Sequence, residues 1–461
     1  MTAAQDPTVS TSPTVRGTTS GAVPVPGSVT ATGGDGPAVP GSLAWATWAL
    51  FVGLAAMLAG AGLFGTLVGV RGDLEGFPVS VNGLISAAYY GGFLIGSRLA
   101  LNALGQVGHI RVYAALASIL AATIIAFGLI VSPPAWVAMR FLTGLCLAGQ
   151  YVVAESWLNQ LTGNENRGRL LAVYGLVTTG AFGVGQLMFG PVDPLTMTGF
   201  AVAAILICLA VAPVALSEDA GPPAITVPAR MSLRELMRIV PTGVGTSLLV
   251  GVAHGGFLGL GALYAVRAGL GTGEIARFVA APMIGGLLLQ WPISAASDDI
   301  DRRAVGVVAA TLAAGAGVLL LVAGPEGWTG LALMAAIGGN SYPLYSIAGA
   351  YTNDWVPSSK ITAAASQLVL LYGAGAMIGP IVTSLMMDAI GIDGFVWTVI
   401  GVHVMIAAFL TYRFFAYRVA LVRRPWSEVS LAARPFFIPV TVVSMGRRLR
   451  ARPTRPPRPQ P

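Results

Sequence analysis

The chain has 461 residues, of which 55% are apolar and only 10% are charged, and its formal net charge is +7. Water-soluble domains carry roughly 25% charged residues, so this composition excludes an ordinary soluble globular protein. Ten arginines and one acid lie in residues 418–461. This tail has no aromatic spacing suited to bases, so we expect it to contact anionic lipid and no nucleic acid.

Twelve apolar stretches follow one another along the chain, separated by short loops. A helix that spans a bilayer satisfies its own backbone and presents apolar side chains to lipid over about 20 residues. The sequence therefore predicts an all-α membrane protein with twelve transmembrane helices. In chain order the predicted spans are Leu43–Val70, Val79–Leu101, Val112–Val131, Ala135–Leu158, Leu170–Phe189, Met197–Leu216, Thr242–Val266, Ile275–Ala296, Ala304–Ala323, Trp328–Ala350, Ile361–Ile390 and Phe395–Tyr417.

The connecting segments define the expected domain boundaries. Residues 1–42 have no basic segment leading into an apolar run, so we expect a disordered cytoplasmic extension rather than a signal peptide. The longest connection, 217–241, lies in the middle and separates an N-terminal bundle (43–216) from a C-terminal bundle (242–417). Within it, Met231–Arg238 alternates apolar and charged residues at helical spacing, which predicts a helix on the membrane surface.

The basic residues of the loops predict the orientation of the chain. One set of loops carries ten Arg and Lys residues, whereas the opposite set carries only Arg71, Arg267 and Arg277. Basic loops face the cytoplasm, so we expect both termini there, in a multi-pass protein of the cytoplasmic (inner) membrane.

The two halves share an internal repeat. Gly91-Gly92 recurs as Gly285-Gly286, and Tyr174-Gly175 recurs as Tyr372-Gly373, at offsets of 194 and 198 residues. An offset of about six spans indicates two pseudo-symmetric six-helix bundles related by an axis along the membrane normal, an arrangement typical of one large class of transporters.

Several stretches resemble motifs of the major facilitator superfamily. QWPISAASDDIDRR, from Gln290 to Arg303, resembles its cytoplasmic G-x-x-x-D-R-x-G-R-R loop, although Asp299 stands where the motif usually has Arg. RFLTGLCLAG, from Arg140, resembles its R-x-x-x-G motif. VVAESWLN (152–159), NRGRLLAVY (166–174) and YPLY (342–345) with Asn353-Asp354 resemble the YcaD-like branch more narrowly. The resemblance implies the fold of that superfamily and transport of a small molecule by alternating access.

Charged residues at the expected cytoplasmic ends of the helices are candidates for a gate. Charge pairs of ~1–3 kcal/mol can hold one state of two rocking bundles and release the other. Alternatively, these residues only anchor helix ends at the interface. The candidates are Arg98, Arg111, Glu155 and Arg169 in the first half, and Asp298, Asp301, Arg302, Arg303 and Asp354 in the second.

Arg140 is the main candidate inside the membrane. A charge in the outer half of a span costs roughly 2.5–3.5 kcal/mol, so it must face a wet cavity or a partner. The resemblance implies that it lines the central cavity, where it serves proton coupling or holds an anionic group. The alternative is a structural arginine bonded to backbone carbonyls.

Other polar residues within the spans are candidates for contacts with a substrate or a proton. His254, in mid-span, could carry protons or be a packed core residue, whereas we expect His403 to be structural. Asn340 and Tyr342 flank Pro343, where we expect the helix to bend and to free carbonyl groups. The weaker candidates are Gln186, Gln290, Trp291, Gln367 and Tyr372.

The sequence favours a monomeric secondary active transporter of a small organic solute, with a proton as coupling ion. It has no G-x-x-x-x-G-K-[ST] motif, and Cys146 and Cys208 lack paired spacing, so we expect no cofactor, metal or ATP hydrolysis. One alternative is a transporter-like sensor without flux. A remote one is a magnesium-dependent enzyme of the prenyltransferase type using Asp298-Asp299-x-Asp301, which would require a second acidic cluster.

Overall fold

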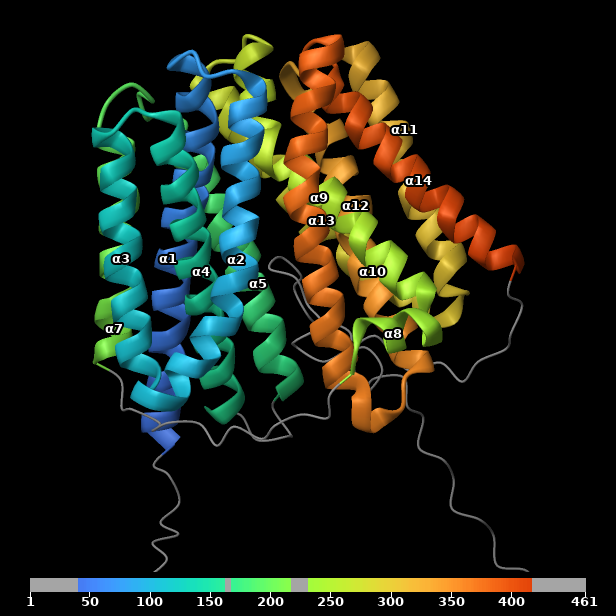
Figure 1. Ribbon diagram of the computed structural model, residues 1–461, viewed down its shortest axis with the longest axis horizontal. Coiled ribbons are helices and arrows are strands. Elements are labelled where there is room, and N and C mark those ends of the chain that lie inside the picture. Colours follow the sequence, from blue (N-terminus) through green and yellow to red (C-terminus); the bar gives the residue numbers. More distant parts are fainter. Residues whose placement is uncertain (1–39, 162–166, 217–230, 417–461) are drawn as a thin grey trace, which may run out of the picture. The chain divides into compact units, whose positions relative to one another are not determined.

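A computed structural model describes residues 40–161, 167–216 and 231–416, with side chains except at 40–47, 159–161, 167–169, 171 and 172 (Figure 1). The expected tail, 418–461, and all but the last three residues of the expected extension lie outside this part. The described elements are helical: α1 (Pro40–Leu74), α2 (Val79–Val107), α3 (His109–Leu129), α4 (Pro133–Leu161), α5 (Arg167–Leu187), α6 (Thr198–Leu209), α7 (Val211–Ala215), α8 (Leu233–Ile239), α9 (Pro241–Arg267), α10 (Thr272–Asp299), α11 (Arg302–Ala323), α12 (Gly327–Trp355), the 3₁₀ turn η1 (Ser358–Lys360), α13 (Ile361–Ile390) and α14 (Gly394–Ala416).

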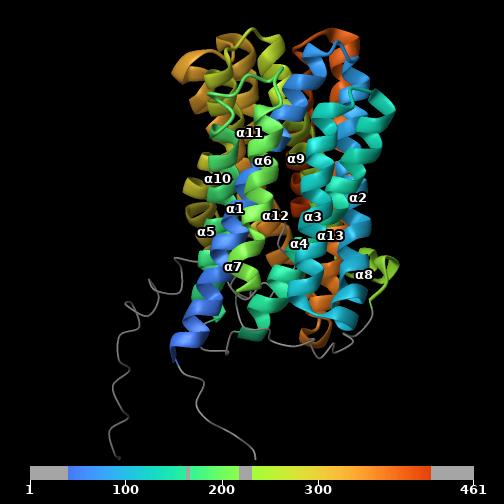
Figure 2. The same ribbon diagram turned by 90° about the vertical axis from the view of Figure 1, so that its left-hand side faces the viewer.

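The helices form two groups in the order of the chain. Helices α1–α7 lie side by side, and α9–α14 form a second group beside them (Figures 1 and 2). The short helix α8 lies in the connection between the groups, where Ser232 caps it by accepting a hydrogen bond from the backbone N–H of Glu235 at 3.1 Å. This is the segment for which the sequence predicts a surface helix.

Ten helices of the described residues are long and apolar enough to cross a membrane. Helices α5 and α12 are not among them. Every residue of α12 from Ile337 to Asn353 is buried, so neighbouring helices rather than lipid surround its polar side chains. Helix α12 is also continuous through Pro343, where the sequence predicts a bend.

One predicted span differs from the structure in a local way. The predicted helix Met197–Leu216 is divided at Ala210 into α6 and α7. Pro213 has no N–H for the carbonyl of Leu209, and its ring crowds that carbonyl, which explains why α6 ends there.

The packing of glycines repeats between the two groups of helices. A Cβ atom at Gly144 of α4 would collide with the carbonyl oxygen of Tyr89 on α2. At Gly338 of α12, 194 residues further along, a Cβ atom would collide with the carbonyl oxygen of Pro282 on α10. The contact of α2 with α4 is therefore repeated by α10 with α12, which gives the offset seen in the sequence a structural meaning.

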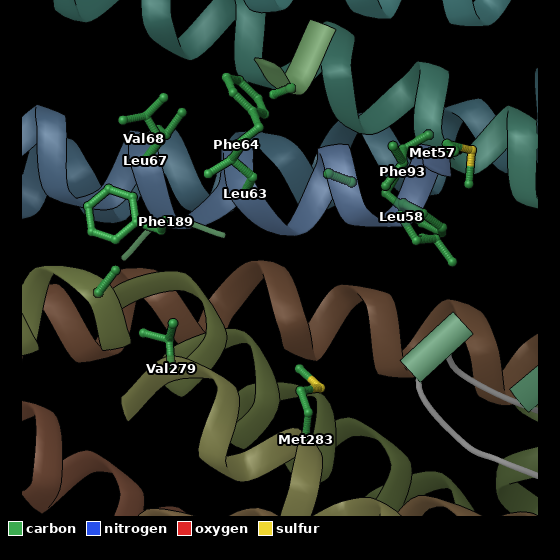
Figure 3. Close-up of a cluster of buried hydrophobic side chains, with 14 of the residues drawn as sticks. Met57, Leu58, Leu63, Phe64, Leu67, Val68, Phe93, Phe189, Val279 and Met283 are labelled. Carbon is green, nitrogen blue, oxygen red and sulfur yellow. The ribbon is translucent and has the colours of Figure 1, made fainter. Parts of the chain in front are cut away.

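Apolar side chains join the two groups in one core. Leu63, Phe64 and Leu67 of α1 belong to the same buried cluster as Val279 and Met283 of α10 (Figure 3). Contact between the halves is thus mainly apolar, which permits them to move against each other without breaking many hydrogen bonds.

We expect Gly144→Ala to destabilise the protein by about 1–3 kcal/mol, because the added methyl group forces α2 and α4 apart. The measurement is the midpoint of thermal unfolding of the purified protein in detergent. Gly315→Ala on α11 is the matched control, since a Cβ atom there meets nothing within 4 Å. Equal midpoints for the two variants would contradict the close packing at Gly144.

Candidate substrate cavity and gates

A cavity lies between the two groups of helices. Its walls come from α1 to α5 on one side and from α9, α10 and α13 on the other. Most of its lining residues are glycine, aliphatic or aromatic. The polar ones among the described residues are Thr66, Ser86, Tyr89, Tyr90, Ser97, Arg140, Thr143, Gln186 and Tyr372. Arg140 is therefore the one charged residue of this lining in the described part of the chain.

Arg140 lies seven residues into α4, between two aromatic rings. The carbon of its guanidinium group is 4.6 Å from the centroid of the Tyr89 ring and 5.2 Å from that of Phe64. Its Nε atom is buried without a hydrogen-bond partner, and no carboxylate of the described residues pairs with it. The rings compensate part of the charge, but the N–H group of Nε still lacks an acceptor. This arrangement attracts an anion.

Gln186 of α5 and Tyr372 of α13 also line the cavity, where the sequence analysis expects them. The side chain of Gln186 is buried, and its Oε1 atom has no hydrogen-bond partner among the described residues. The cavity thus offers a cation on one helix and an unused amide acceptor on another.

Six other candidates are absent from the lining of this cavity: Gln290, Asn340, Gln367, Trp291, His254 and Tyr342. The amide group of Gln290 donates to the hydroxyl groups of Ser294 and Ser346, at 3.0 and 3.1 Å. These bonds satisfy the amide nitrogen within the packing of α10 and α12. Asn340 donates to the carbonyl of Ala336, one turn back in the same helix, at 2.9 Å.

Gln367 and Trp291 also lie outside the lining of the cavity. Gln367 donates to the backbone carbonyl of Met231 at 3.0 Å, and so ties α13 to the segment that precedes α8. The indole of Trp291 lies on the surface of the helical group, with 52% of the residue exposed. The sequence indicated polar or aromatic residues on spans but not which face of the helix carries them.

His254 is at the centre of a buried polar chain. Its Nδ1 atom is 3.0 Å from the hydroxyl of Tyr372, and its Nε2 atom is 3.1 Å from Oγ of Ser341. The Nε2 atom of His403 lies 2.8 Å from the same Oγ atom of Ser341. The Nδ1 atom of His403 lies 2.7 Å from the carbonyl oxygen of Val399. Ser341 was not among the predicted site residues, and His403 was expected to be structural.

Tyr342 packs against this chain without joining it. The centroid of its ring is 4.7 Å from that of His254, and its hydroxyl donates to Sδ of Met283 at 3.3 Å. Tyr342 is fully enclosed by α9, α10 and α12 and is not part of the cavity lining.

The second-half gate candidates meet where α10, α11 and α12 end or begin. Arg302 donates to Asp354 at 2.8 Å and to Asp298 at 3.1 Å, and its side chain is only 2% exposed. Such buried pairs are costly to break, at about 3–5 kcal/mol. Arg303 bonds Asp301 at 2.8 Å and the carbonyl of Arg413 at 2.8 Å, so this cluster also holds the end of α14.

The first-half candidates are described only in part. Arg98 and Arg111 are exposed, and the side chain of Arg169 lies outside the described residues. Glu155 accepts a hydrogen bond from the hydroxyl of Tyr174 at 3.0 Å. Among the side chains that the structure describes, the clearest charge cluster is the one around Arg302 in the second half.

Lys360 donates a hydrogen bond to Glu235 of α8 at 2.7 Å. It is not part of the Arg302 cluster, which consists of Arg302, Arg303, Asp298, Asp301 and Asp354. The hydrogen bond from Lys360 is the main reason why the pKa of Glu235 lies below its usual value. Because the carboxyl pKa is lower in the folded protein, the pair stabilises the fold when the pH is above the usual pKa of a glutamate. This stabilisation is lost as the pH falls through the lowered pKa of Glu235. Both side chains are more than a third exposed, so solvent weakens the pair.

At the opposite end of the helices, three polar contacts join the two halves. Arg267 pairs with Asp73 at 2.6 Å, Ser86 donates to the carbonyl of Gly259 at 3.0 Å, and Thr272 donates to the carbonyl of Gly190 at 2.8 Å. We call this the Asp73 end. Asp73 and Arg267 are 194 residues apart, which is the offset of the internal repeat. Equivalent residues near a pseudo-two-fold axis meet, so the repeat was the signal that could have revealed this pair.

Two helical bundles around a central cavity, with polar ties between them at one end, define a multi-pass membrane transporter. The sequence agrees with this class, since residues 269–454 match the model of the Major Facilitator Superfamily. An uncharacterized MFS-type transporter of Enterobacter sp. (strain 638) is 29% identical over 349 residues, covering 74% of this chain and 88% of the relative. The uncharacterized MFS-type transporter YcaD of Escherichia coli (strain SE11) is 29% identical over 317 residues, covering 66% of this chain and 79% of the relative.

Solved structures show the same fold. The nucleoside transporter NupG has a TM-score of 0.65 at 15% identity, covering 81% of this chain and 100% of NupG. A bacterial homologue of the human lysosomal transporter Spinster, in an inward-facing and unoccupied conformation, has a TM-score of 0.64 at 14% identity, covering 86% of this chain and 99% of the homologue. The chain is thus similar in sequence and fold to transporters of the major facilitator superfamily, and among them to YcaD-like members, and these similarities point to a transporter rather than an enzyme.

We expect Asp73→Asn to loosen the contact between the halves at the Asp73 end. A partly exposed ion pair is worth about 1 kcal/mol, so the ratio of closed to open states should fall about fivefold. The measurement is the distance distribution between spin labels at Leu195→Cys and Trp328→Cys, with the exposed Cys208 replaced by serine.

The charge reversal Asp73→Arg with Arg267→Asp should restore the parental distance distribution, because it recreates the pair. A distribution that is the same in all three proteins would contradict a role of this pair in closure.

Proposed function

We propose that this protein is a secondary active transporter of small organic anions that have an apolar body, and that it works by alternating access with a proton as coupling ion. The observation that carries the proposal is Arg140, a cation without a carboxylate partner in an otherwise uncharged cavity. A substrate anion would supply the missing acceptor.

The chemistry of the walls supports this class of substrate. A planar guanidinium group can hold a carboxylate through two parallel hydrogen bonds, which a lysine cannot reproduce. The aromatic and aliphatic lining suits an apolar body. Gln186 could accept a hydrogen bond from a hydroxyl or amide group of the same ligand, because its Oε1 atom is unused.

The distribution of polar contacts supports alternating access. The halves are tied at the Asp73 end, and the cavity extends between them to Ser97 and Val369, well along α2 and α13. We infer a state closed at the Asp73 end. The opposite end, with the Arg302 cluster and the charged residues of the first half, then forms the gate toward the cytoplasm, with both termini on that side of the inner membrane.

We expect at least one acid from a panel of aromatic and branched aliphatic monocarboxylates to raise the midpoint of thermal unfolding of the purified protein. The matching neutral amide should have no effect, because it lacks the charge that Arg140 requires. Arg140→Lys should weaken the binding of that acid by about 1–3 kcal/mol, the value of a charged hydrogen bond. Arg234→Lys, on the exposed face of α8, is the control.

Equal stabilisation by acids and amides, or by none of the acids, would exclude the proposed substrate class. Flux is then measured with the labelled acid in proteoliposomes under an imposed pH gradient. Binding without accumulation would indicate a sensor rather than a transporter.

A further inference from the structure

We propose that Tyr372, His254, Ser341 and His403 form a proton-binding chain that opens on the substrate cavity and couples proton uptake to the binding of the anion. The inference rests on the proposed function, because it assigns the coupling proton to particular atoms. It begins from the observation that two buried imidazoles share one hydroxyl, and that the far end of their chain is a cavity residue.

The geometry fixes the direction of every hydrogen bond in the neutral chain. The Nδ1 atom of His403 faces a carbonyl oxygen, which can only accept, so Nδ1 carries the proton and Nε2 is an acceptor. Ser341 must therefore donate its single proton to His403. The oxygen of Ser341 then accepts from Nε2–H of His254, whose Nδ1 atom accepts from the hydroxyl of Tyr372.

The chain can take up one proton without losing a hydrogen bond. A proton from the cavity binds the oxygen of Tyr372 while the original hydroxyl proton of Tyr372 moves to Nδ1 of His254, which becomes an imidazolium. The proton on Nε2 of His254 can next move to Ser341, and that of Ser341 to Nε2 of His403. His254 is then neutral with its proton on Nδ1, and His403 carries the charge. One proton enters, and the hydrogen bonds that join Tyr372, His254, Ser341 and His403 to one another reverse their direction.

Among the described residues around the chain, the imidazoles of His254 and His403 are the groups that can accept a proton. Neither imidazole contacts a carboxylate or a guanidinium group of the described residues, and no carboxylate of those residues lines the cavity. The titratable groups that pack around the chain are phenols: Tyr342 and Tyr345 from α12, Tyr372 from α13 and Tyr90 from α2. Helix α10 contributes Met283, and α14 contributes His403 itself.

The reversal changes what the cavity offers to a ligand. In the neutral chain Tyr372 donates inward, so that its oxygen can only accept from the cavity. After proton uptake the same hydroxyl can donate to the cavity, and a positive charge lies behind it. Both changes favour an anion. Since coupling between two ligands is reciprocal, a bound anion must also favour proton uptake, which is the thermodynamic requirement of symport.

The first test is ¹⁵N NMR of the full-length protein in lipid vesicles, with labelled histidine. The protein has three histidines, so the three single His→Gln variants assign every histidine signal. We expect His254 to be protonated on Nε2 and His403 on Nδ1 at neutral pH. The opposite tautomer at either residue would overturn the proposed direction of the chain. On acidification an imidazolium signal should appear at one of the two, and its absence down to about pH 5 would overturn proton binding.

The second test uses the acid from the panel that binds most tightly. We expect its affinity to rise about tenfold between about pH 7.5 and about pH 5.5, within the range typical of coupled sites. His254→Gln and His403→Gln should each abolish this rise. His109→Gln is the matched control, because His109 contacts Ser156 at 3.2 Å and is not part of the chain.

The two proposals fail in different ways. If an acid binds but its affinity depends equally on pH in the parent protein and in His254→Gln, the proton chain is wrong and the substrate class stands. If no acid binds, the substrate class is wrong, and the tautomers and proton uptake of the ligand-free protein still decide on the chain.

Discussion

A guanidinium group that pairs with no carboxylate of the described residues is the constraint on which the proposed function depends. Arg140 lies seven residues into α4, and two aromatic rings flank it. A cation–π contact is worth about 0.5–2 kcal/mol, less than the ~2.5–3.5 kcal/mol that a charge costs at this depth. The rest must come from the cavity and what enters it. In the proposed function, the apolar packing around Arg140 favours a ligand that brings a negative charge to it.

The internal repeat explains the stability of each half and, in the proposed mechanism, the movement of one half against the other. Close glycine contacts, such as that of Gly144 with the Tyr89 carbonyl, hold helices together within each half and recur in the other half. Between the halves the contact is mostly apolar, with a few polar ties at the Asp73 end. Strong packing within halves and weak polar contact between them is what rigid-body rocking requires.

Much of the fold followed from hydropathy, because the bilayer imposes a length and a composition on every span. The fold class was predicted from apolar periodicity and is confirmed, and the family resemblance predicted from short motifs agrees with the similarity to MFS-type transporters. Arg140 could be found in the same way, since a charge within a span is conspicuous. Trp291 and Gln367 were misplaced because sequence does not determine which face of a span meets the cavity. Ser341 was missed since a serine in a membrane helix normally bonds its own backbone.

His403 shows most clearly what sequence could not supply. Its importance comes from Ser341, 62 residues away on another helix, whose one hydroxyl both histidines share. In the proposed mechanism this network and Arg140 have complementary roles. The anion compensates Arg140, and the proton compensates the anion, so that one proton and one anion cross together without net charge. The pH gradient drives such a cycle, and the membrane potential has no effect on it because no net charge moves. The entry of an anion alone would cost ~2.3 kcal/mol per 100 mV of membrane potential. A cavity that holds one cation and no carboxylate is suited to that exchange.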